Sequence, residues 1–288
     1  MRKFAAIWTT DRGYYPGTNA SLNALEHYGN DLDIYILTWG DFLPDDYKAQ
    51  WPNVRFSHID NTSYPGRNAG WYFRFMDFDF SLRHLFDKYD AVLFWSADQC
   101  VVNNIMLYFE ICAKSGTIIL GTNEHGNHSR EFQSLSKNRP YQHTWSVPYT
   151  DQPIFIPASD TRLIEEVLRQ QKTGDHLSRM DGLNYAARDL KLNVLEVPGE
   201  LWIQNVPYVT RLKYAGEKVY LGESSSQLCA FHRRYWNKTV CSKYLPGQDE
   251  RSRSISRGNK MLFNRLYNFF NRKCRVPWTE GLEIWDGS

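Results

Sequence analysis

Short apolar runs alternate with segments of helical periodicity through most of this sequence, and that alternation restricts the chain to few folds. The apolar runs predict strands over residues 4–9, 33–38, 54–59, 90–95, 117–121 and 192–197. Side chains at helical spacing predict helices over residues 19–28, 71–89, 161–171 and 180–188. Strands separated by helices favour an α/β fold, with a mostly parallel central sheet and helices on both faces.

The sequence divides near residue 247 into two parts of different composition. The strands and helices named above all lie in residues 1–247, which we interpret as one domain. Residues 248–288 form a predicted appendage, because eight Lys or Arg and no Asp or Glu lie between Arg251 and Arg275. Leu and Phe recur between these cations at helical spacing, so the appendage is predicted to be helical, basic and aromatic.

The composition limits the classes of protein to which the chain can belong. With 288 residues, 42% of them hydrophobic, it can bury a large core, and its net charge of +2 does not make the whole chain a polyanion binder. The five cysteines form no Cys-x-x-Cys pair, which argues against a zinc site or a disulfide framework. The first apolar run is too short for a signal peptide and none is long enough to span a membrane, so we expect a cytoplasmic protein.

Two loops follow strands at the edge of the predicted sheet where ligands usually bind, beyond the carboxyl ends of the strands. Thr9 and Asp11 come at the end of the first strand, where they can accept hydrogen bonds from a nucleobase or a ribose. Ser96-Ala97-Asp98 directly follows residues 90–95, the clearest buried strand. A carboxylate at Asp98 suits a divalent ion that binds a diphosphate, although a strand-end Asp often only caps a turn.

Further candidates are cationic or able to ligate a metal. Arg74 lies in the aromatic stretch of helical spacing, where it can bind a phosphate or form an ordinary surface ion pair. His232 follows an apolar run, and a neutral imidazole can ligate a metal, but an isolated histidine is more often structural. Arg233 and Arg234 come next and can bind phosphate. Spacing alone leaves the functional and the structural interpretation of each open.

The order of these motifs resembles that of glycosyltransferase family 8 and its relatives with the GT-A fold, over about residues 3–240. The matching stretches are Thr9-Thr-Asp11 with Tyr15, Tyr72-Phe-Arg74, Tyr89-Asp-Ala-Val-Leu-Phe-Trp-Ser-Ala-Asp98, Asp181-Gly-Leu-Asn184, residues 195–202 and Phe231-His232. The third is similar to the strand that leads into the family's DxD motif, and residues 195–202 look like a later strand. The resemblance implies a GT-A transferase that moves a hexose or similar sugar from a nucleotide diphosphate sugar, with retention.

The resemblance also implies a role for each candidate. Asp98 and His232 would hold a manganese-like ion, Mn²⁺ or Mg²⁺. Asp181 would hydrogen-bond the donor sugar, and Gln152, in the polar pair Asp151-Gln152, would lie near the anomeric carbon. The residues that would surround the rest of the donor are Thr9, Asp11, Tyr15, Arg74, Ser96, Arg233 and Arg234.

Three departures from the family pattern bear on these roles. Ser96 stands where the first Asp of DxD is expected, so metal affinity should fall, because a neutral hydroxyl replaces an anionic oxygen. Met180 precedes Asp181 where the family usually has a polar amide. Arg233 and Arg234 occupy positions where the family has other residues, and they can replace part of the lost metal charge at the diphosphate.

The sequence leaves the acceptor open. A glycan or a lipid-linked saccharide is one candidate, with residues 251–275 contacting a membrane surface as interfacial helices do. A modified base in DNA is another, because cations and aromatic side chains also suit phosphates and stacked bases. Residues 251–275 can instead pack on their own domain. A further alternative is a GT-A binding protein without catalytic activity, which the missing first Asp favours.

Overall fold

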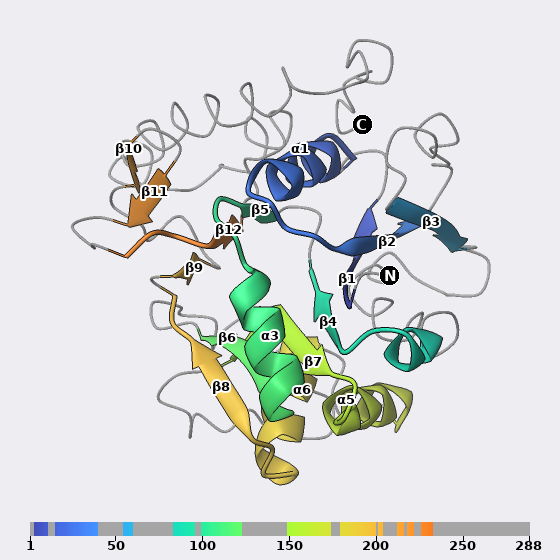
Figure 1. The fold of residues 1–288 in the computed structure, drawn as a ribbon. Coiled ribbons are helices and arrows are strands. Elements are labelled where there is room, and N and C mark those ends of the chain that lie inside the picture. The colour runs from blue at the N-terminus through green and yellow to red at the C-terminus, as the bar shows by residue number, and fades with distance from the viewer. Residues whose placement is uncertain are drawn as a thin grey trace, which may run out of the picture.

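The computed structural model of the chain describes residues 3–10, 15–39, 54–59, 83–95, 99–122, 149–173, 179–199, 201–203, 212–215, 218–221 and 226–232. The largest feature of this part is a seven-stranded sheet with the order β3-β2-β1-β4-β7-β6-β8 (Figure 1). Its strands are β1 (Phe4–Thr10), β2 (Asp33–Trp39), β3 (Val54–Ile59), β4 (Ala91–Phe94), β6 (Ile118–Thr122), β7 (Tyr149–Pro157) and β8 (Val194–Val197).

The sheet is mixed but mostly parallel, which confirms the predicted fold class. Strands β1 to β4 run parallel to one another, and β6 runs parallel to β8. Only β7, within this sheet as the structure describes it, is antiparallel to both of its neighbours, β4 and β6. The sequence did not predict β7, because Thr150, Asp151 and Gln152 make its first half polar and Pro153 interrupts it.

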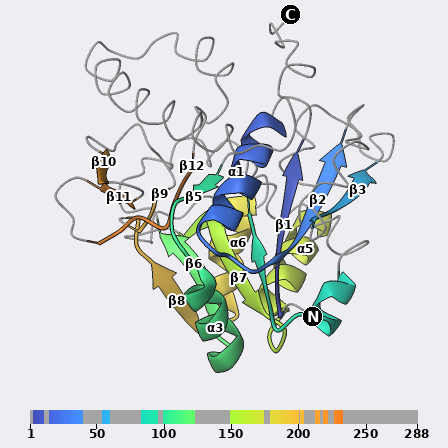
Figure 2. The same cartoon turned by 45° about the horizontal axis from the view of Figure 1, so that its top comes forward.

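Helices cover both faces of the sheet, as predicted (Figure 2). One face packs against α1 (Tyr15–His27) and α3 (Met106–Ser115), and the other against α5 (Arg162–Thr173) and α6 (Arg179–Asp189). Because side chains alternate along a strand, Leu93 of β4 enters the first core while its neighbour Val92 enters the second. The central sheet is therefore buried on both sides.

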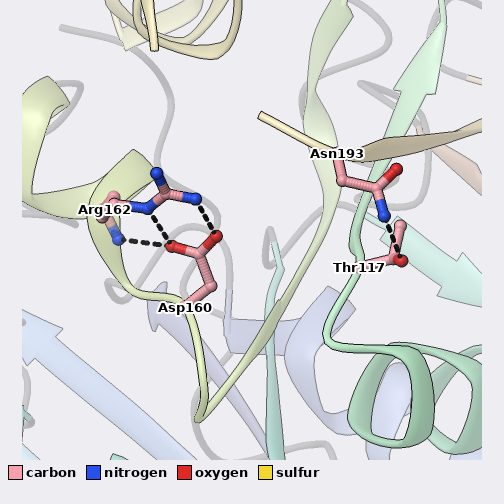
Figure 3. A network of polar contacts seen from close by, with 4 residues as sticks. All are labelled: Thr117, Asp160, Arg162 and Asn193. Carbon is pink, nitrogen blue, oxygen red and sulfur yellow. Dashed lines mark hydrogen bonds and ion pairs between the residues drawn. The ribbon is translucent and has the colours of Figure 1, made fainter. Parts of the chain in front are cut away.

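Helix α5 begins at a cap made by its own flanking residues (Figure 3). The Asp160 carboxylate accepts a hydrogen bond from the backbone N–H of Arg162 and two more from its guanidinium, at 2.8 and 2.6 Å. These bonds satisfy a backbone donor that the first helical turn leaves free. They also hold the pKa of the Asp160 carboxyl below its usual range.

A second, three-stranded sheet has the order β5-β12-β9. Its strands are β5 (Gln99–Val101), β12 (Ala230–His232) and β9 (Trp202–Ile203). The Ser21 hydroxyl of α1 donates a hydrogen bond to the carbonyl oxygen of Gln99 and so attaches β5 to the helix. A separate hairpin pairs β10 (Leu212–Ala215) with β11 (Lys218–Leu221).

Two sequence predictions need correction or lie beyond the described ranges. Residues 195–202 are not one strand, because the chain leaves the main sheet after Val197 and Trp202 pairs in the second sheet. The predicted helix over residues 71–89 is described only from residue 83, where η4 (Arg83–Asp87) is a short 3-10 helix. Residues 233–288, and with them the predicted appendage, lie outside the described part. No helix within that part is long and apolar enough to cross a membrane.

Candidate functional site

The carboxyl ends of β1 and β4 lie at the same edge of the main sheet. The two strands are parallel, with Ile7 opposite Phe94, and the N–H of Trp95 donates to the carbonyl oxygen of Ile7 at 2.8 Å. Thr9 follows Ile7 by two residues, so its backbone lies at the edge where β4 also ends. This is the edge where ligands bind in open α/β sheets.

The pairing of β5 with β12 places the backbone of His232 beside Gln99, the residue that follows Asp98 in the sequence. In the antiparallel register His232 lies opposite Gln99, and antiparallel partners have Cα atoms about 4.5–5.5 Å apart. Gln99 directly follows Asp98 in the sequence, and Asp98 itself lies outside the described residues. The strand register therefore makes neighbours of His232 and Gln99, which the sequence separates by more than a hundred positions.

The Gln99 side chain at this junction is buried without hydrogen-bond partners. Its exposure is 0%, and neither its amide oxygen nor its amide nitrogen has a partner among the described residues. The indole nitrogen of Trp202 is also buried and has no hydrogen-bond partner among the described residues. Buried polar atoms of this kind are rare in proteins and call for an explanation, such as a ligand or a bound water.

An aromatic cluster fixes the end of β4 relative to the second sheet. Trp95, which directly follows β4, packs edge-to-face on Trp202 of β9, with ring centroids 6.0 Å apart. Trp202 in turn contacts Phe155 of β7 at 5.9 Å and Tyr108 of α3 at 6.3 Å. Since β9 pairs with β12, the cluster ties the strand that carries His232 to the carboxyl end of β4.

Gln152 of β7 lies close to the same edge. The register of β7 with β4 pairs Ile154 with Phe94, so Gln152 lies just beyond the last pair. Its side chain is 3% exposed, and its amide oxygen has no partner among the described residues. Gly121 of β6 permits this approach, because a Cβ there would lie 2.7 Å from the Gln152 carbonyl oxygen.

Helix α6 brings Asp181 to this part of the molecule. Asn184 follows Asp181 by three residues, one turn along the helix, and holds α6 against the start of β7. The N–H of Tyr149 donates to the Asn184 side-chain oxygen, and the Asn184 amide donates to the Tyr149 carbonyl oxygen, both at 2.8 Å. The backbone of Asp181 therefore lies one helical turn from the residue that docks α6 on β7.

The predicted site residues fall into three groups by what the structure describes of them. Gln152 is described completely and is buried. The backbone alone is described for Thr9, Tyr15, Asp181 and His232. Outside the described residues lie Asp11, Arg74, Ser96, Asp98, Arg233 and Arg234. Within the described ranges there is no group of three or more His, Cys, Asp or Glu side chains that could hold a metal.

Sequence reasoning gave no role to Gln99, Tyr149 or Arg188. Arg188 could have been linked to Asn184, because a spacing of four residues puts both on one helix face. Their contact with Tyr149 had no sequence signal, since it depends on how α6 packs on β7. The unpartnered amide of Gln99 likewise depends on what surrounds it in three dimensions.

The fold of the chain is the GT-A fold of glycosyltransferases, as the motif order predicted. Among solved structures, the galactosyltransferase LgtC in complex with donor and acceptor sugar analogs is similar, with a TM-score of 0.56 and 12% identity over 98% of this chain and 99% of that one. Mouse xyloside xylosyltransferase 1 has a TM-score of 0.54 and 9% identity over 81% and 98%. The bifunctional glycosyltransferase WbbM has a TM-score of 0.50 and 11% identity over 91% of this chain and 51% of its own. No model of a known family and no curated protein matches the sequence.

Proposed function

We propose that this chain is a retaining glycosyltransferase that moves a sugar from a nucleotide diphosphate sugar to a glycan or a lipid-linked saccharide. The observation that carries the proposal is the register of β5 with β12, which sets His232 beside the residue that follows Asp98, at the ligand edge of a GT-A fold. The similar structure of LgtC contains donor and acceptor sugar analogs, which supports the substrate class.

Asp98 and His232 are the residues that would hold Mn²⁺ or Mg²⁺. Carboxylate oxygen and imidazole nitrogen are both ligands that Mn²⁺ accepts, and the pairing of His232 with Gln99, the residue after Asp98, supports this donor set. When bound, such an ion would supply positive charge to the departing nucleotide diphosphate. Because Ser96 provides no second carboxylate, Arg233 and Arg234 bind the diphosphate and supply the remaining charge.

The donor sugar is bound between β7 and α6 in this proposal. The buried amide oxygen of Gln152 accepts a hydrogen bond from a sugar hydroxyl, or faces the positive charge that develops at the anomeric carbon. Asp181 hydrogen-bonds the sugar from the neighbouring helix. Thr9, Asp11 and Tyr15 surround the nucleoside at the end of β1 and the start of α1.

A screen of nucleotide sugars for hydrolysis in the presence of Mn²⁺ tests the activity. With the preferred donor, Asp98→Asn should lower turnover by at least about a hundredfold, because it removes the carboxylate from the ion. His232→Ala should lower it by about tenfold to a hundredfold. Full activity in excess chelator would show that the metal assignment is wrong and would leave Arg233 and Arg234 as the charge-stabilising groups.

Acceptors are then tested with the preferred donor. Transfer to an oligosaccharide or a lipid-linked saccharide supports the proposal, and residues 251–275 would then bring the enzyme to the membrane surface that presents such acceptors. Transfer to hydroxylated bases in duplex DNA, with none to saccharides, would reverse the acceptor assignment. A protein that binds nucleotide sugars tightly but neither hydrolyses nor transfers them would be a binding protein with the same fold.

A further inference from the structure

The side chain of Asn184 makes a two-point attachment between α6 and β7. It accepts a hydrogen bond from the N–H of Tyr149 and donates one to the carbonyl oxygen of the same residue, both at 2.8 Å. Asn184 is 2% exposed, so the attachment is shielded from water. An amide side chain that bonds both backbone groups of one residue fixes the position and the direction of that backbone, as a neighbouring strand would.

Arg188 strengthens the same attachment. Its guanidinium donates to the side-chain oxygen of Asn184 at 2.8 Å and lies over the ring of Tyr149, 4.4 Å from the centroid. Burial and the neighbouring Glu196 raise the pKa of the Tyr149 phenol, while Arg188 acts in the opposite direction. The amide, the cation and the ring therefore form one packed unit, which we call the Asn184 clamp: Asn184, Arg188 and Tyr149.

The clamp lies beside the two residues assigned to the donor sugar. Tyr149 is the first residue of β7 and lies opposite Thr122, at the carboxyl end of β6, so the clamp is at the ligand edge of the sheet. Gln152 follows Tyr149 by three residues on the same strand, and Asp181 precedes Asn184 by three residues on the same helix. The clamp thus joins the two elements close to the point where each carries a proposed site residue.

We propose that Asn184 is a positioning residue of the transferase, one that sets Asp181 against Gln152 through the docking of α6 on β7. This inference rests on the proposed function. Asn184 touches neither the donor nor the reacting atoms; it keeps the helix at the distance from β7 that the sugar requires. A displacement of about 1 Å in such a constellation can lower a rate by about a hundredfold, so losing the clamp should affect turnover.

The chain offers a matched control at the opposite edge of the sheet. The Asn193 side chain donates to the Thr117 hydroxyl at 2.9 Å and so joins the residues that precede β8 and β6 (Figure 3). Asn193 and Asn184 are both asparagines bonded across elements of the same core. Asn193, however, lies at the amino ends of β6 and β8, far from the carboxyl edge where the site is built.

The experiment compares Asn184→Ala with Asn193→Ala in the full-length chain. Both should lower the midpoint of thermal unfolding. Only Asn184→Ala should lower kcat for donor turnover, by about tenfold to a hundredfold, with a donor KM close to that of the wild type. Asn184→Asp keeps the acceptor for Tyr149 N–H and for Arg188, so it should recover part of kcat. Equal kcat in folded Asn184→Ala and Asn193→Ala would overturn the inference.

Hydrogen exchange separates this inference from the proposed function. In Asn184→Ala the backbone amides of residues 179–184 should exchange faster than in the wild type, and in Asn193→Ala they should not. If exchange at residues 179–184 is unchanged in Asn184→Ala, the clamp does not hold α6 and the inference is wrong. If exchange changes as expected but the wild type turns over no donor, the proposed function fails and the positioning role fails with it.

Discussion

Replacing Gln99 by leucine should make the free protein more stable. The Gln99 amide is buried at 0% exposure, and neither of its polar atoms has a partner among the described residues. A buried polar group left unbonded costs about 1–3 kcal/mol, and leucine of similar size carries no such group. The Ser21 hydroxyl binds the backbone carbonyl of residue 99, so the substitution keeps that bond. We therefore expect the free energy of unfolding to rise by about 1–3 kcal/mol.

Urea denaturation measures this change, with Gln227→Leu as the control. The Gln227 amide donates to the carbonyl oxygen of Val102 at 3.1 Å in a partly buried position. Its removal leaves that oxygen without the bond, so Gln227→Leu should lower the free energy of unfolding by about 1 kcal/mol. The two glutamine-to-leucine substitutions should thus have opposite signs, and an unchanged m-value would show that both act on stability alone.

A destabilised Gln99→Leu protein would refute the reasoning. A loss as large as that of Gln227→Leu would mean that the Gln99 amide is hydrogen-bonded in solution, by bound water or by a group of the site itself. Donor binding distinguishes these two cases. If the site supplies the partner, donor or Mn²⁺ should raise the thermal midpoint of the wild type more than that of Gln99→Leu.

Two further predictions concern buried phenol and thiol groups. Tyr89→Phe should lower the free energy of unfolding by about 1–3 kcal/mol near pH 7, since the phenol donates to Asp33 at 2.7 Å. Burial and that bond raise the pKa of the Tyr89 phenol in the folded state. The wild type should therefore lose this stability as the pH rises above about 10, where the unfolded phenol ionises, and Tyr89→Phe should not. Parallel profiles of stability against pH for the two proteins would contradict this. Burial raises the pKa of the Cys112 thiol to about 12 and also raises the pKa of the Cys229 thiol. Neither thiol should therefore react with a thiol reagent at pH 8 until urea unfolds the protein. Rapid labelling of either cysteine in peptide maps of the native protein would contradict this.

The strands and helices whose local sequence has a clear apolar run or a helical period were predictable from the sequence. Phe4–Thr10, Asp33–Trp39 and Ala91–Phe94 are apolar runs, and the helix Arg162–Thr173 has a strong helical period; local composition determines such elements wherever they pack. Strand β7 escaped prediction because its first half, around Gln152, is polar and is stabilised by β4 and β6 on either side. Helix α3 (Met106–Ser115) also escaped, since its apolar side chains show little helical periodicity.

The sequence by itself determined the class of fold, the order of the motifs and the types of residue available for chemistry. Strand periodicity and the Ser96-Ala97-Asp98 motif are local properties, and they require no knowledge of distant residues. The tertiary structure alone decided which of these residues meet: His232 beside Gln99, and Asn184 on Tyr149. Such contacts depend on strand register and on helix docking. The packing of both hydrophobic cores determines register and docking together, so no single stretch of sequence encodes these contacts.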